Sequence, residues 1–96
     1  MQQVNLKIKN LIEMEELATT LASYIEEYPV IIFLDGDLGA GKTTFTQFLA
    51  KSLGVKDVVT SPTFNIFKRY QGEKRVLNHF DLYQFLHLQL LVVLQP

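Results

Sequence analysis

The sequence predicts an α/β fold, a three-layer sandwich in which helices cover both faces of a central, mostly parallel sheet. Residues 30–34 form a continuous apolar run, mostly β-branched or aromatic, which is typical of a strand buried on both faces. Apolar residues recur with helical spacing on either side of this run, at residues 11–28 and 43–53. We therefore expect helices to alternate with strands along the chain.

The composition fits one cytoplasmic domain and argues against several classes of protein. The chain has 96 residues, with nine Lys plus Arg against ten Asp plus Glu, so bulk positive charge does not mark it as a nucleic-acid binder. It has no cysteine, which excludes disulfides and thiolate metal sites. The chain does not open with a signal-peptide pattern, and its most apolar stretch, residues 82–94, is shorter than the roughly 20 residues that span a bilayer.

The N-terminal third predicts a strand followed by a helix. Residues 4–8 alternate between apolar and polar side chains, as in a short strand. Asn10 followed by Glu13 resembles a capping box at the start of a helix, and Pro29 ends that helix. One apolar stripe runs along it: Leu11, Met14, Leu17, Ala18, Leu21, Ala22, Ile25 and Tyr28.

The rest of the chain predicts a second helix and a hairpin. Residues 43–53 have one apolar face, and Gly54 is the expected C-terminal stop. Residues 64–70 alternate, residues 71–74 look like a turn, and residues 75–80 are expected to pair back as a second strand.

Residues 36–43 read Gly-Asp-Leu-Gly-Ala-Gly-Lys-Thr, a spacing that matches a nucleotide-phosphate-binding loop (P-loop). Backbone N–H groups of such a loop point inward at the phosphates, and a Cβ atom at its three glycines would obstruct that geometry. The helix that follows adds its positive N-terminal end. Lys42 is expected to reach the β- and γ-phosphates, and the Thr43 hydroxyl to take one position on Mg²⁺. The alternative is an ordinary glycine-rich turn between a strand and a helix.

Two further residues are candidates for the catalytic site. Asp81 ends the strand-like segment at residues 76–80, where a carboxylate can hold Mg²⁺ and orient the attacking water; a turn or helix N-cap aspartate is the alternative. Thr63 follows Ser61 and Pro62, in a loop where P-loop enzymes often place a threonine that senses the γ-phosphate. The alternative is that Ser61 and Pro62 only start a turn.

Other charged or polar side chains have simpler interpretations. Asp37 carries a charge that opposes phosphate, so we expect it to face solvent or to cap the loop backbone. His79 is expected to be a packed strand histidine rather than a ligand. A basic group at the hairpin is expected to be solvated, with contact to RNA or to an acidic partner as the alternative. Its members are Lys68, Arg69, Lys74 and Arg75.

Three motifs of the chain, Gly36–Phe45, Ser61–Phe64 and His79–Tyr83, together resemble the TsaE family and occur in the family's order. These are bacterial ATPases needed to make threonylcarbamoyladenosine in tRNA, and the resemblance covers residues 4–83. It implies a small α/β P-loop fold that binds ATP and Mg²⁺ and hydrolyses ATP slowly. It also implies TsaB and TsaD as partner subunits, with hydrolysis resetting their complex between turnovers and tRNA involved only indirectly.

The resemblance implies a role for each residue of the motifs. It implies that Lys42, Thr63 and Asp81 are catalytic residues, and that the last two lie near the γ-phosphate. It also implies that Thr43 is a Mg²⁺ ligand. The residues that it places on the nucleotide are Gly36, Asp37, Leu38, Gly39, Ala40, Gly41, Lys42, Thr43 and Thr44.

The chain departs from the family pattern after Tyr83. Family members follow the Asp-Leu-Tyr run with arginine, and Gln84 stands there instead. They continue through an acidic helix and a strand with a Glu-Trp motif that completes the Mg²⁺ site, and residues 84–96 have neither feature. We therefore expect a P-loop ATPase domain at residues 1–83 whose C-terminal part is missing, an atypical apolar tail at residues 84–96, and an unpaired sheet edge. Catalytic competence is left open.

Two other functions stand as alternatives. A small P-loop kinase needs an acceptor pocket and lid arginines, whereas the only arginines are Arg69 and Arg75, near the hairpin turn. A catalytically inactive nucleotide-binding module is the other alternative, because the segment that completes the Mg²⁺ site is missing. A GTPase is disfavoured, since no Asn-Lys-x-Asp motif occurs.

Overall fold

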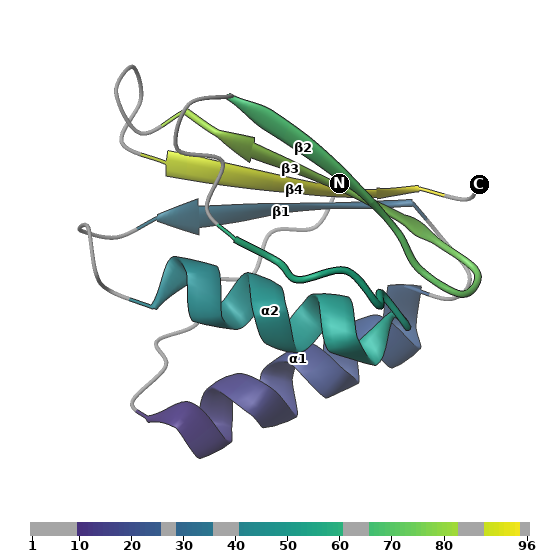
Figure 1. Ribbon diagram of the computed structural model, residues 1–96. Coiled ribbons are helices and arrows are strands. Elements are labelled where there is room, and N and C mark those ends of the chain that lie inside the picture. Colours follow the sequence, from purple (N-terminus) through teal and green to yellow (C-terminus); the bar gives the residue numbers. More distant parts are fainter. Residues whose placement is uncertain (1–9, 26–28, 36–40, 61–65, 83–87, 95–96) are drawn as a thin grey trace.

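Two helices lie on one face of a four-stranded sheet in the computed structural model, and the fold is α/β, as predicted (Figure 1). The structure describes residues 10–25, 29–35, 41–60, 66–82 and 88–94. In chain order the elements are α1 (Leu11–Ile25), β1 (Val30–Asp35), α2 (Lys42–Ser52), β2 (Phe67–Gln71), β3 (Val76–Asp81) and β4 (Leu88–Leu94). The strand expected at residues 4–8 lies outside the described residues. None of the described helices is long and apolar enough to cross a membrane.

The prediction of a mostly parallel sheet is wrong, because the three pairs of neighbouring strands that the structure describes are all antiparallel. The strand order is β1-β4-β3-β2, so β4 lies between β1 and β3. Ile32 stands opposite Leu91 on one side of β4, and Asn78 stands opposite Val92 on the other. A parallel neighbour needs a crossover of about a dozen residues, and the connection from β3 to β4 is much shorter. The apolar tail segment thus supplies a central, antiparallel strand.

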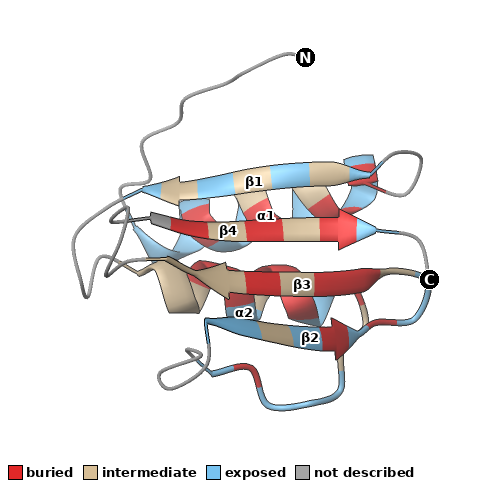
Figure 2. Cartoon of the chain, turned by 90° about the horizontal axis from the view of Figure 1, so that it is seen from above, coloured by how far each residue is buried: buried red, intermediate tan, exposed pale blue. Residues whose placement is uncertain are grey.

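The prediction of three layers is also wrong for the described residues, because both helices cover the same face of the sheet (Figure 1). Figure 2 shows the other face without a covering element among the described residues. Burial alternates along β1: Ile31 and Phe33 are 52% and 64% exposed, whereas Val30, Ile32 and Leu34 are half-buried. The strand expected to be buried on both faces is therefore buried on one.

Helix α1 begins where the sequence predicts. The Oδ1 atom of Asn10 accepts a hydrogen bond from the Glu13 backbone N–H at 2.9 Å, as an N-cap does. At the other end, the Ile25 carbonyl accepts a hydrogen bond from Nε of Arg75 at 3.4 Å, which ties the helix to the hairpin. Residues 26–28, where the sequence predicts the last turn of this helix, lie outside the described part of the chain. The buried residues of α1 are Met14, Ala18, Ala22 and Ile25.

The predicted hairpin is confirmed by β2 and β3, which pair antiparallel. Its turn packs on the C-terminal end of α2, where the Glu73 backbone N–H donates a hydrogen bond to the Leu53 carbonyl at 2.9 Å. Gly72 permits this approach, because a Cβ atom there would clash with the Leu53 carbonyl oxygen. Gly54 follows with a φ of 81° and ends α2 as predicted. The hairpin is therefore fixed against the second helix.

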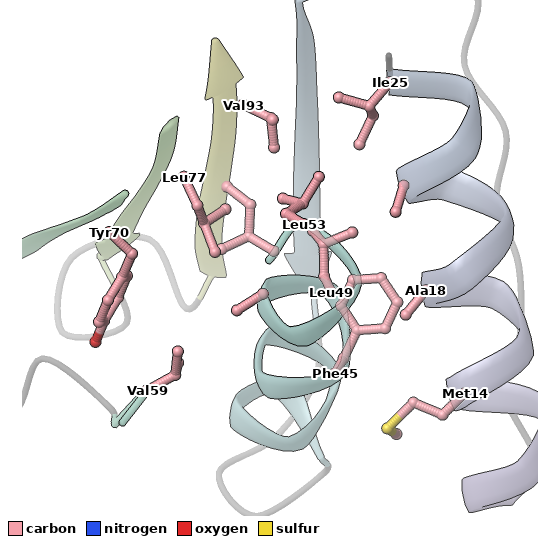
Figure 3. Close-up of a cluster of buried hydrophobic side chains, with 13 residues drawn as sticks. Met14, Ala18, Ile25, Phe45, Leu49, Leu53, Val59, Tyr70, Leu77 and Val93 are labelled. Carbon is pink, nitrogen blue, oxygen red and sulfur yellow. The ribbon is translucent and has the colours of Figure 1, made fainter. Parts of the chain in front are cut away.

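The hydrophobic core lies between the helices and the sheet (Figure 3). Leu49 of α2 packs at its centre, with Leu77 of β3 and Val93 of β4 on the sheet side. All three side chains are fully buried. Burying each such side chain stabilises the fold by roughly 1.5–3 kcal/mol. This packing holds α2 against the sheet and thereby sets where its N-terminus lies.

Candidate phosphate-binding site

The N-terminus of α2 is the described part of the predicted phosphate-binding loop. Gly41 is its N-cap residue, in the left-handed conformation with φ 92° and ψ 12°, and no described side chain caps the turn. Residues with a Cβ atom rarely adopt this conformation, and a Cβ here would lie 2.9 Å from Cε of Met14. The Gly41 carbonyl accepts the Phe45 N–H at 2.9 Å and so starts the helix. Without a capping side chain, the first-turn N–H groups and the positive helix end suit an anion.

The first turn of α2 carries the side chains expected to hold phosphate and Mg²⁺. Lys42, Thr43 and Thr44 are half-buried there, and the turn contains no acidic residue. The Thr46 hydroxyl donates a hydrogen bond to the Lys42 carbonyl at 2.9 Å, which fastens this turn from within the helix. The rest of the predicted loop lies outside the described residues, so its ring of N–H groups stays a prediction. Those residues are Gly36, Asp37, Leu38, Gly39 and Ala40.

Asp81 is the last residue of β3, and the end of β3 lies on the same side of the molecule as the start of α2 (Figure 1). β1 and β3 are each antiparallel to β4, so they run in the same direction and their carboxyl ends lie at the same end of the sheet. At that end Asp35 stands opposite Leu88, and Asp81 stands opposite Gln89. The structure thus brings Asp81 to the side of the sheet where Lys42 begins the helix. Its role in catalysis stays a prediction.

Thr63 lies outside the described residues. The described residues before and after residues 61–65 form hydrogen bonds with the rest of the fold. The Gln47 amide donates a hydrogen bond to the Val59 carbonyl at 2.9 Å. The Tyr70 hydroxyl donates one to the carbonyl of Thr60 at 3.3 Å, and accepts one from its N–H at 3.4 Å. On the other side, the Ile66 carbonyl accepts the Asp81 N–H at 2.7 Å.

His79 is a packed strand histidine, as the sequence predicts. It is fully buried, and its Nε2 atom lies 2.7 Å from Oε1 of Gln89. Burial lowers the pKa of His79 below its ordinary value of 6.5, and the Gln89 hydrogen bond and the Asp81 charge oppose that shift. Nδ1 of His79 is buried without a hydrogen-bond partner. Sequence reasoning missed Gln89 as the partner, although a polar residue next to the apolar run at residues 90–94 was the available signal.

Two members of the basic group at the hairpin form hydrogen bonds within the protein. Nζ of Lys68 donates a hydrogen bond to the Thr60 hydroxyl at 3.1 Å. Arg75 donates to the Ile25 carbonyl and, through Nη1, to the Lys74 carbonyl at 2.8 Å. Arg69 and Lys74 are exposed, as expected of a solvated group, and contact with RNA or an acidic partner stays the alternative.

The fold and site together define an α/β protein in which a helix bearing lysine and threonine in its first turn begins beside the carboxyl ends of two strands. The family model for the threonylcarbamoyl adenosine biosynthesis protein TsaE matches residues 8–94. The chain therefore belongs to the TsaE family, as its motifs predict. No solved structure matches it significantly.

Three relatives illustrate this membership, each named as the tRNA threonylcarbamoyladenosine biosynthesis protein TsaE. The Bacillus subtilis protein is 40% identical over 84 residues, which cover 88% of this chain and 52% of the relative. The Aquifex aeolicus protein is 44% identical, over 77% of this chain and 59% of the relative. The Haemophilus influenzae protein is 36% identical, over 73% of this chain and 44% of the relative. The chain spans about half the length of these curated relatives.

Proposed function

We propose that the chain is an ATP-binding subunit of the bacterial machinery that makes threonylcarbamoyladenosine in tRNA. The observation that carries this proposal is the start of α2, where an N-terminus that no described side chain caps carries Lys42 and Thr43 on the same side of the molecule as the end of β3 at Asp81. The family relationship supports the pathway, since the relatives carry its name. TsaB and TsaD are the proposed partner subunits, and tRNA is involved only through them.

The residues present fit a nucleoside triphosphate with Mg²⁺. Gly41 has a φ of 92°, a left-handed conformation that favours glycine and that loops use where backbone N–H groups surround a phosphate. Among the described residues no group of three acidic, histidine or cysteine side chains could hold a metal by itself. Mg²⁺ that keeps most of its ligands as water and phosphate oxygens needs only a few protein oxygens, such as the Thr43 hydroxyl. Bound Mg²⁺ supplies charge neutralisation at the β- and γ-phosphates.

Each side chain has a separate part in the proposed slow hydrolysis of ATP. The Lys42 ammonium attracts the β- and γ-phosphates, and the first-turn N–H groups of α2 hold phosphate oxygens. The Asp81 carboxylate would hold Mg²⁺, directly or through water, and would orient the water that attacks the γ-phosphate. Thr63 contacts the γ-phosphate and reports its loss. Hydrolysis then resets the complex with TsaB and TsaD between turnovers.

Phosphate release by the chain mixed with TsaB, TsaD, ATP and Mg²⁺ tests the proposed activity. We expect slow release that requires all three proteins, and a loss of it in Asp81→Asn, which keeps the shape of the side chain but removes its charge. Asp57→Asn is the matched control, because Asp57 is exposed and lies outside the sheet. ATP binding without any release would identify a nucleotide-binding module instead. Phosphate transfer to a small acceptor would identify a kinase and overturn the proposal.

A further inference from the structure

The Met14 side chain of α1 lies against Gly41, the residue that begins α2. A Cβ atom built at Gly41 would lie 2.9 Å from Cε of Met14, so the methionine methyl group occupies the space beside the Gly41 Cα atom. Met14 is buried, and Figure 3 shows its side chain directed from α1 toward α2. A residue of the first helix therefore contacts the turn that opens the proposed phosphate site.

Gly41 depends on such contacts for its conformation. It has a φ of 92°, and glycine adopts positive and negative φ about equally readily, so its own backbone does not favour this state. No described side chain caps the turn. Its carbonyl accepts the Phe45 N–H at 2.9 Å, which starts α2. A change in conformation at Gly41 would therefore also change the direction of the N–H groups in the first turn.

The position of Met14 is itself fixed by the start of α1. Its N–H donates a hydrogen bond to the Asn10 carbonyl at 3.1 Å, and Asn10 also caps the helix through its side chain. One turn later Ala18 is fully buried, and its small side chain lets α1 pack closely on α2. The Met14 methyl group is thus held in place by α1, and not by the turn that it contacts.

We infer that Met14 is a positioning residue for the proposed phosphate site, and this inference rests on the proposed function. Its methyl group holds Gly41 in the left-handed conformation and keeps the first-turn N–H groups, with Lys42, in the geometry that binds phosphate. A site that is already ordered binds more tightly than one that has to be ordered on binding. Truncating Met14 should therefore weaken nucleotide binding, whereas truncating a residue that only fills the core would change stability alone.

Isothermal titration of ATP with Mg²⁺ into folded Met14→Ala, Met14→Leu and Ile25→Ala separates these two roles. Met14→Ala leaves a space beside Gly41 and should weaken binding roughly threefold to tenfold, the factor by which the competent conformation loses population. Met14→Leu conserves the side-chain volume and should restore most of the affinity. Ile25→Ala is the matched control, because Ile25 is fully buried at the other end of α1. It should lower the stability in urea without changing the affinity.

Hydrogen exchange of single amides, followed by NMR without nucleotide, tests the contact separately from binding. The Phe45 N–H donates to the Gly41 carbonyl and should exchange faster in Met14→Ala than in the wild type. The reference in the same helix is the Leu53 N–H, which donates to the Leu49 carbonyl at 3.0 Å at the far end of α2. Its exchange should rise less than that of Phe45. Equal acceleration of both amides would show a general loss of stability and overturn the inference.

The outcomes distinguish this inference from the proposed function. If the wild type binds ATP and Lys42→Ala binds it more weakly, but folded Met14→Ala binds like the wild type, the proposed function stands and the role of Met14 is refuted. If the wild type binds no ATP, both fail. Circular dichroism shows which variants are folded. Where an alanine variant is not, Met14→Val and Ile25→Val replace the pair under the same criteria, because valine retains more of the side chain.

Discussion

Replacing Gly72 with alanine tests how closely the hairpin turn packs on α2. The added Cβ atom would clash with the Leu53 carbonyl oxygen and would lie 2.9 Å from the Arg75 carbonyl oxygen. Both are backbone atoms, so the turn itself has to move, and the 2.9 Å hydrogen bond from the Glu73 N–H to Leu53 is lost. Overpacking costs about 1–3 kcal/mol and a lost hydrogen bond about 0.5–1.5 kcal/mol, so the free energy of unfolding should fall by about 2–4 kcal/mol.

Urea unfolding followed by circular dichroism measures this change. For a domain of this size the same loss lowers the Tm by roughly 8–32 °C, which calorimetry detects readily. Ser52→Ala is the control, because Ser52 is exposed at the end of the same helix and should change little. If Gly72→Ala stays within about 0.5 kcal/mol of the wild type, the turn does not approach α2 as described.

Three further predictions concern single contacts. Asn10→Ala removes the cap of α1 and should lower the free energy of unfolding in urea by about 1 kcal/mol. Tyr70→Phe removes the hydroxyl that bonds the Thr60 backbone and should cost about 0.5–1.5 kcal/mol; wild-type stability would contradict that contact. The pKa of His79 is lowered by burial, so the unfolded state binds a proton more readily and stability should fall as pH decreases from 6.5. Unfolding measured at several pH values should show a smaller fall for His79→Gln than for the wild type, and an identical fall would refute this assignment.

Local signals in the sequence were sufficient to predict α1, the start of α2 and the hairpin. Asn10 and Glu13 predict a helix start because the capping bond joins residues three positions apart. The glycines of residues 36–41 predict the turn into α2, and the left-handed conformation of Gly41 is the conformation that only glycine adopts readily. Such features depend on neighbouring residues, so they do not require knowledge of the tertiary structure.

The sheet arrangement could not be predicted in the same way. The run at residues 30–34 is equally apolar whether one or two layers cover it, and the described helices cover only one face. The direction of its neighbour depends on β4, whose pairing joins residues about 60 positions apart, such as Ile32 and Leu91. A strand period was visible in neither segment, because continuous apolar runs show none. The sequence of residues 84–96 therefore did not predict that β4 lies between β1 and β3.

The candidate site was predicted in part. Lys42 and Thr43 lie in the first turn of α2, and Asp81 lies at the end of β3, both where the motifs indicate. The contact of His79 with Gln89 could not be foreseen, because it depends on the register between β3 and β4. The anchoring of Thr60 by Tyr70 likewise requires the position of β2 against α2.

Isothermal titration of ATP with Mg²⁺ into the wild type, Lys42→Ala and Lys51→Ala tests most directly whether the start of α2 binds phosphate. Lys51 is exposed in the last turn of the same helix, so its substitution removes the same charge far from the proposed site. Hydrogen bonds to charged groups contribute about 1.5–3 kcal/mol, so Lys42→Ala should weaken binding by roughly tenfold or more, and Lys51→Ala should leave it unchanged. Equal affinities of Lys42→Ala and the wild type would contradict the phosphate-binding site.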